Sequence, residues 1–142
     1  MTDHLTPDKR SWNMSRISSK NTKPELLVRR YLYSNGFRYR LHCKTLPGKP
    51  DLLNKSKKIT VFVNGCFWHQ HPNCKRANLP KSNRKYWIPK LERNIKRQED
   101  NLNLLISWGW YVHTIWECEV QNPIKLKKLL SLIKNSGGIV SK

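Results

Sequence analysis

Apolar residues recur along the chain with two periods, and each period predicts a different kind of element. Residues 22–36 place apolar side chains at helical spacing after a start signal of Thr22 and Pro24, and Gly36 ends the pattern. Residues 59–63 (Ile-Thr-Val-Phe-Val) form a β-branched, apolar run, which predicts a buried strand.

The remaining segments complete an α/β pattern. Residues 66–90 contain three prolines and many polar groups, and we expect them to be irregular. Elsewhere the pattern predicts short strands at 38–41 and 50–53, a strand at 110–116, a long helix with its apolar stripe over 91–105, and a C-terminal helix within 121–142. Helices flanking a few strands predict a three-layer α/β domain with a central mixed sheet.

Composition adds the class of partner. The 142 residues suit one domain, and no repeat or linker divides them, so we expect a single domain over 1–142. A net charge of +19, from 28 Lys plus Arg against 9 Asp plus Glu, predicts a polyanionic partner. Six Trp, five Tyr and three Phe exclude a disordered basic tail. No apolar run approaches the roughly 18–20 residues of a membrane span, and the N-terminus lacks a signal-peptide pattern. We expect a soluble, intracellular protein without a membrane partner.

Carboxylates are scarce in the first part of the chain. Residues 9–58 contain fourteen Lys or Arg but only two acids, Glu25 and Asp51. Binding Mg²⁺ beside a substrate phosphate is one reason to keep acids in such a region. Each acid also has a structural explanation, since Glu25 can complete a capping box with Thr22 and Asp51 can be a turn residue. Pro50-Asp51 before a buried strand matches only the start of a nuclease pattern, whose second acid is absent at Asn64 and the residues after it.

Cysteine and histidine spacing predicts a second kind of metal site. Cys66, His71 and Cys74 have C-x4-H-x2-C spacing, and Cys118 can supply a fourth ligand to a structural Zn²⁺. The alternative is three buried cysteines and two surface histidines. Cys43 is left over, and we expect it to be a small buried hydrophobic residue.

Two further groups of residues suggest nuclease chemistry. If His71 binds zinc, His69 is free to act as a general acid or base near Asp51. Taken alone, a histidine in such a position is more often an ordinary surface residue. Phe67, Trp68 and Trp87 lie in an irregular region beside Lys and Arg, a setting that suits stacking on bases or wedging between base pairs. Their alternative role is to cover the core.

Taken together, the motifs resemble one known family. The runs Gly65-Cys66-Phe67-Trp68-His69 and Trp116-Glu117-Cys118 closely resemble the very short patch repair (Vsr) endonucleases of bacteria. Asn13-Met14-Ser15-Arg16-Ile17, Lys20-Asn21-Thr22-Lys23-Pro24-Glu25, Phe37-Arg38-Tyr39-Arg40 and Leu46-Pro47-Gly48-Lys49-Pro50-Asp51-Leu52 extend the resemblance, which covers about residues 6–120.

The resemblance implies a Mg²⁺-dependent endonuclease that nicks one DNA strand 5′ of the T in a T:G mismatch. It also implies a restriction-endonuclease-like α/β fold with a structural zinc. The protein would be a monomer in the bacterial cytoplasm, associated with the nucleoid. Its partners would be double-stranded DNA and mismatch-repair proteins. The residues it implies are Asp51, His69 and Glu25 for catalysis, Asp51 and the carbonyl of Val63 for Mg²⁺, Cys66, His71, Cys74 and Cys118 for Zn²⁺, and Phe67, Trp68, Trp87, Met14 and Arg16 for DNA, the last two in an N-terminal arm over 1–20.

Two positions depart from the family pattern. Asn64 stands where some members have His, and Gln98 stands where members often have Asp. A neutral amide at 98 would orient a catalytic imidazole less well, and the neighbouring Glu99 and Asp100 are conceivable substitutes. Two alternatives to the mismatch endonuclease therefore stay open: a restriction-type endonuclease of the same fold, and a DNA-binding module that has a structural zinc but no catalytic activity.

Overall fold

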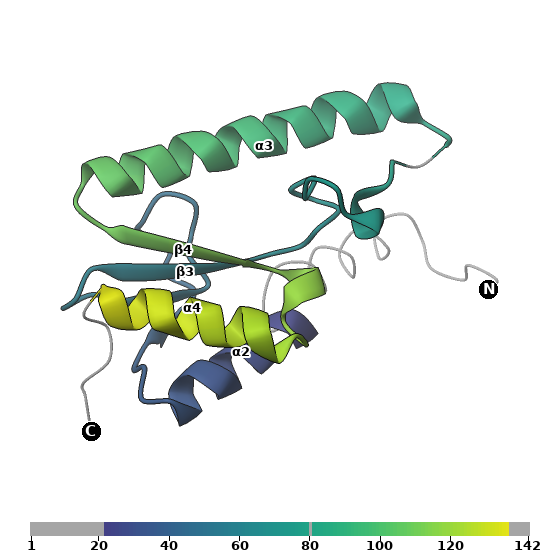
Figure 1. Ribbon diagram of the computed structural model, residues 1–142. Coiled ribbons are helices and arrows are strands. Elements are labelled where there is room, and N and C mark those ends of the chain that lie inside the picture. Colours follow the sequence, from purple (N-terminus) through teal and green to yellow (C-terminus); the bar gives the residue numbers. More distant parts are fainter. Residues whose placement is uncertain (1–21, 80, 137–142) are drawn as a thin grey trace, which may run out of the picture.

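The computed structural model describes residues 22–79 and 81–136 (Figure 1). The expected N-terminal arm, with Met14 and Arg16, lies outside the described residues, as do the last six residues of the expected C-terminal helix. Within the two described ranges, no helix is long and apolar enough to cross a membrane.

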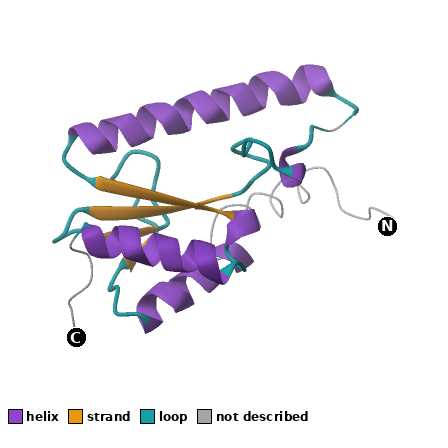
Figure 2. Ribbon diagram, viewed as in Figure 1, coloured by secondary structure: helices purple, strands orange, loops and turns teal. Residues whose placement is uncertain are grey.

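One four-stranded mixed sheet lies at the centre of the domain, in the order β1-β2-β3-β4 (Figure 2). β1 (Arg40–Leu41) pairs antiparallel with β2 (Leu52–Asn54), and β2 pairs antiparallel with β3 (Ile59–Asn64). β3 then runs parallel to β4 (Tyr111–Trp116), with Val63 opposite Ile115. The expected α/β class and mixed sheet are confirmed.

Among the described residues, three α-helices cover the two faces of this sheet (Figure 1). α2 (Lys23–Ser34) and α4 (Pro123–Asn135) lie on one face, and α3 (Arg84–Ser107), which makes the crossover between the parallel strands, lies on the other. The main core fills the space between the sheet and the α2–α4 layer. Its fully or nearly fully buried members are Val28, Leu32, Phe37, Leu52, Ile59, Val61, Ile115, Val120, Leu129, Leu130 and Ile133.

The start of α3 differs from the sequence prediction. The helix begins at Arg84, so part of the segment expected to be irregular is helical, and Pro89 lies inside it. Proline removes one backbone donor in a helix interior, which is why its presence argued against a helix here. The helix continues through Pro89 because its apolar side is buried beyond it, with Leu91 and Leu105 almost completely covered.

Candidate active site and metal cluster

Asp51 lies directly before β2 begins, next to the end of the neighbouring strand β3. Its Oδ2 accepts a hydrogen bond from the backbone N–H of Val63, at 2.7 Å. The preceding turn contains two residues in the left-handed region, Gly48 (φ +77°) and Lys49 (φ +49°). A Cβ at Gly48 would lie 3.1 Å from the Phe62 ring, so both the backbone angle and the space favour glycine there. The turn and the Val63 bond together fix the carboxylate at the end of β3.

Glu25 reaches the same place from the first turn of α2. Thr22 caps the helix by accepting a hydrogen bond from the Glu25 N–H, at 3.3 Å. The Glu25 carboxylate, however, is 2% exposed as a residue and contacts His42 Nε2 at 2.8 and 3.0 Å and Arg29 Nη1 at 3.2 Å. The side chain is therefore engaged inside the domain, and helix capping alone does not explain it.

The two acids and His42 form a compact group of candidate metal ligands. One ligand atom from each of Glu25, His42 and Asp51 can be chosen so that all three atoms lie within 4.8 Å of one another. Burial, followed by the negative charge of Glu25, raises the pKa of Asp51 to about 7, although the Val63 N–H acts in the opposite direction. A buried pair of carboxylates is stabilised by a cation, so this donor set fits a divalent metal ion.

His69 borders a cavity of about 310 Å³ between the 48–49 turn and α3. Its Nδ1 is buried and has no hydrogen-bond partner among the described residues. Burial lowers the pKa of this imidazole, which favours its neutral form. The other residues that line the cavity are Gly48, Lys49, Asn94, Arg97, Gln98 and Asn101. The cavity therefore combines an imidazole with two cations, Lys49 and Arg97, and Lys49 lies two residues before Asp51.

Asn64 and Gln98, the two residues that depart from the family pattern, contact each other. Asn64 Nδ2 donates to Gln98 Oε1 at 3.0 Å, and Gln98 Nε2 donates to Asn64 Oδ1 at 2.9 Å. The expectation that neighbouring acids substitute for an Asp at 98 is not supported by their contacts: Glu99 is exposed, and Asp100 pairs with Lys96 at 3.0 Å on the exposed surface of α3.

The four predicted zinc ligands lie together at the end of the sheet. Ligand atoms of Cys66, His71, Cys74 and Cys118 all lie within 4.8 Å of one another. The His71 Nδ1 is 3.7 Å from Cys66 Sγ and 3.4 Å from Cys118 Sγ. Burial raises the pKa of the Cys66 thiol to about 12, so its thiolate needs a nearby cation. Three sulfurs and one imidazole nitrogen are the donor set of a closed tetrahedral zinc site.

The loop that carries three of these ligands is tied to the end of β4. The His71 ring stacks on Trp116, with centroids 4.1 Å apart and planes 9° apart. The Cys66 N–H donates to Glu117 Oε1 at 3.4 Å. Gln70 (φ +47°) and Asn73 (φ +58°) make left-handed turns that fold the loop back on itself. A metal ion bound by this loop and Cys118 would connect two segments about fifty residues apart.

The three predicted DNA-contacting aromatics form one cluster. The Phe67 centroid is 5.2 Å from that of Trp68 and 5.4 Å from that of Trp87. Tyr86 is 56% exposed, and its ring centroid is 5.0 Å from that of Trp87. Sequence reasoning did not assign Lys90, whose Nζ lies 5.5 Å from the Trp68 centroid. The cluster joins the zinc loop to the first turns of α3, and its rings are only partly buried.

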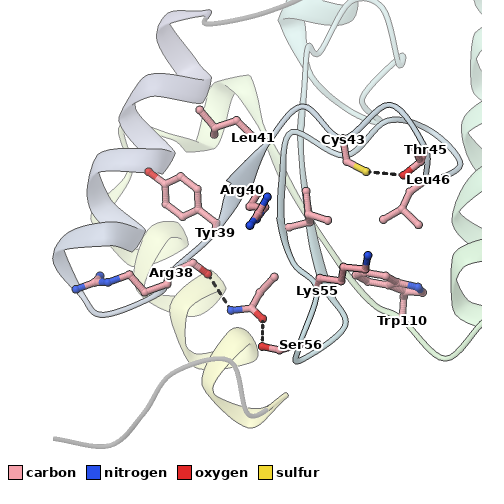
Figure 3. A pocket seen from close by; sticks show the side chains of 12 residues that line it. Arg38, Tyr39, Arg40, Leu41, Cys43, Thr45, Leu46, Lys55, Ser56 and Trp110 are labelled. Atoms are coloured by element: carbon pink, nitrogen blue, oxygen red, sulfur yellow. Dashed lines mark hydrogen bonds between the residues drawn. The ribbon is translucent and has the colours of Figure 1, made fainter.

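Cys43 lies apart from the other cysteines. It borders the larger cavity of about 720 Å³ beside β1 and β2, and its Sγ is 3.1 Å from Thr45 Oγ1 (Figure 3). Cys43 is partly exposed, so the expectation that it is buried was wrong, because its side chain lines this cavity. Arg40 and Lys55 line the same cavity (Figure 3).

Comparison with known proteins places these features in context. The family described as DNA mismatch endonuclease Vsr matches residues 2–76. Type II nicking enzyme V.XorIIP of Xanthomonas oryzae pv. oryzae is 46% identical over 86% of this chain and 89% of its own length. Type II nicking enzyme V.NmeAIP of Neisseria meningitidis is 42% identical over 96% and 99%, respectively. DNA mismatch endonuclease Vsr of Escherichia coli is 32% identical over 82% of this chain and 74% of its own.

Proposed function

This chain belongs to the DNA mismatch endonuclease Vsr family and is a DNA endonuclease, and we propose that it nicks one strand of a duplex 5′ of the T in a T:G mismatch, in a reaction that depends on Mg²⁺. Relatives named as nicking enzymes favour cleavage of one strand. A relative named as a mismatch endonuclease favours the mismatch as substrate.

The observation that carries this proposal is the position of Asp51 against the end of β3 and beside Glu25. We assign Asp51 and the carbonyl of Val63 as ligands of Mg²⁺, with Glu25 as the second acid of the site. The 2.7 Å hydrogen bond from the Val63 N–H to Asp51 supports this, because it holds the carboxylate against the backbone of the same residue. Bound there, Mg²⁺ would polarise the scissile phosphate and stabilise the leaving oxyanion.

His69 is the residue we assign to proton transfer. Its buried ring has a lowered pKa, and the neutral form that this favours can accept a proton from an attacking water. Lys49 and Arg97 line the same cavity and supply positive charge where a backbone phosphate would enter. In this assignment the cavity holds the phosphate, and Asp51 and Glu25 hold the metal ion.

Mismatch selectivity comes, in our proposal, from the aromatic cluster. Phe67, Trp68 and Trp87 would enter the base stack beside the mismatch, a step that costs least where pairing is already weak. Partial exposure of the rings and the adjacent Lys90 support a role at a DNA surface. Met14 and Arg16 in the N-terminal arm would contact a groove of the DNA, and this assignment rests on the sequence resemblance alone.

The cysteine–histidine group is, we propose, a structural zinc site. It contains a full set of four ligands, which leaves no open position for a substrate, and it lies between the aromatic loop and β4. Zinc would thus fix the loop that carries Phe67, Trp68 and His69. We propose with it a restriction-endonuclease-like fold, a single domain over 1–142, a monomeric protein and mismatch-repair proteins as further partners.

A nicking assay on matched and T:G-containing duplexes tests the proposal. We expect a single nick in the T-containing strand of the mismatched duplex, in Mg²⁺ and not in EDTA. Equal cleavage of matched DNA at one sequence would identify a restriction-type endonuclease instead. DNA binding with no cleavage of either duplex would show that catalysis has been lost.

A further inference from the structure

We propose that His42 is a positioning residue, which holds Glu25 and Asp51 at the spacing that a metal ion requires. The inference rests on the proposed function, because it presumes that these acids bind the metal. His42 lies outside the runs of residues that carry the resemblance to the family. His42 contacts both acids, Asp51 through its main chain and Glu25 through its imidazole.

The first contact is through the main chain. The His42 N–H donates to the carbonyl oxygen of Asp51 at 3.2 Å. This bond continues the β1–β2 pairing, in which Leu41 is opposite Leu52, by one residue. His42 has a φ of +50°, in the left-handed region where the Cβ of an L-residue crowds the backbone. Such backbone conformations persist only where the surrounding contacts hold them.

The second contact is through the imidazole. Nε2 lies 2.8 Å from Glu25 Oε2 and 3.0 Å from Oε1. Because carboxylate oxygens accept hydrogen bonds, we assign the tautomer that carries its hydrogen on Nε2, and this N–H donates to both oxygens. Arg29 approaches Oε2 from the next turn of α2, at 3.2 Å. The left-handed turn at His42 is what points the ring from the β1 end toward α2. One residue therefore ties Glu25 on the helix to Asp51 at the start of β2.

These contacts identify positioning rather than metal ligation as the role of the ring. Nε2 uses its hydrogen to bind Glu25, so it has no lone pair for a metal ion in this arrangement. Groups that hydrogen-bond to a ligating carboxylate fix its orientation, and their loss typically weakens metal binding. Without the His42 bond, the buried carboxylate of Glu25 would be freer to turn away from the like charge of Asp51.

The chain offers a matched set of variants. His42→Asn keeps a residue that tolerates positive φ, but its amide is too short to reach Glu25 from that position. His42→Gln places an amide N–H at about the same number of bonds from the backbone as Nε2, and it lacks the imidazole. His113→Gln is the control, because His113 is a partly buried histidine on β4 that contacts Ser136 Oγ at 3.1 Å.

The experiment measures Mn²⁺ binding to the full chain without DNA, from the free Mn²⁺ signal in electron paramagnetic resonance. Mn²⁺ prefers the same oxygen ligands as Mg²⁺. We expect His42→Asn to weaken Mn²⁺ binding by about tenfold or more, because a metal ligand loses its hydrogen-bond partner. His42→Gln should bind Mn²⁺ within about threefold of the wild type. His113→Gln should bind as the wild type does.

Two results would overturn the inference while leaving the proposed metal site intact. In the first, Asp51→Ala abolishes binding but His42→Asn binds as tightly as the wild type. In the second, His42→Gln, folded by circular dichroism, is as weak as His42→Asn, which would make the ring itself a ligand. A wild-type protein that binds no Mn²⁺, or an Asp51→Ala variant that binds it normally, would instead overturn the metal site and this inference together.

Discussion

Asn64 and Gln98 exchange two hydrogen bonds, at 2.9 and 3.0 Å, across thirty-four residues of sequence. Asn64 is the last residue of β3 and only 3% exposed, so its amide has little access to water. Gln98 comes from α3 and also lines the His69 cavity. The two positions that depart from the family pattern are thus matched to each other, and together they fasten α3 to the strand that carries Val63.

A double-mutant cycle should show that this amide pair acts as a unit. Asn64→Ala and Gln98→Ala should each reduce the free energy of unfolding by about 1–3 kcal/mol, because each leaves a partly buried amide without its partner. The double variant should lose less than the sum of the two, by about 0.5 kcal/mol or more. Urea unfolding of the four proteins measures the coupling, and strictly additive losses would show that the pair is not coupled.

Zinc removal should destabilise the domain. We expect the purified protein to carry one Zn²⁺ per chain, and Cys118→Ser to lower both zinc content and thermal stability sharply, since a structural metal contributes folding free energy directly. Cys43→Ser is the control, because Cys43 lies outside the cluster. Elemental analysis and thermal melts provide the measurement. A folded, active sample without zinc would rule out the assignment of all four ligands.

The aromatic cluster should affect mismatch recognition more than general DNA binding. Trp68→Ala should weaken binding to a T:G duplex by about 1–3 kcal/mol, as loss of base–aromatic stacking does, with little change for matched DNA. The salt dependence should stay the same, because no cation is removed. Trp108→Ala is the control, since Trp108 is 49% exposed at the end of α3.

Titrations at two salt concentrations distinguish the possibilities. Equal weakening on matched and mismatched DNA would make Trp68 a general contact, and mismatch selectivity would then arise elsewhere. Loss of folding would mean that the ring supports the core.

Without Mg²⁺, the protein should lose stability as the pH rises from about 4 to about 7. Asp51 has a pKa of about 7 in the folded state and 3.8 as its ordinary value. Between these values the folded protein retains a proton that the unfolded chain has released, so unfolding becomes more favourable as the pH increases. Asp51→Asn should flatten this part of the profile. Urea unfolding across this range in buffer without added Mg²⁺ tests it, and identical profiles for both proteins would contradict it.

Much of the fold followed from local patterns. The β-branched run became β3, and the cap at Thr22 became the start of α2, because these signals act over a few residues. The start of α3 was missed because burial of Leu91 and Leu105, which is a tertiary effect, outweighs the local cost of Pro89.

The candidate site was predictable only where a motif marked it. Cys66, His71 and Cys74 have a ligand spacing that the sequence displays, and the structure brings them to Cys118 as expected. His42 and the Asn64–Gln98 pair have no such spacing. Their partners come from distant segments and meet only after the sheet and helices pack, so neither periodicity nor a motif could reveal them.

Cleavage and binding by Asp51→Ala, measured side by side in Mg²⁺, test the central claim most directly. The variant should bind a T:G duplex as well as the wild type or slightly better, because a negative charge facing phosphate is removed. It should produce no nick, because the carboxylate that holds the metal ion is gone. Nicking of the T:G duplex at the wild-type rate by Asp51→Ala would contradict the account.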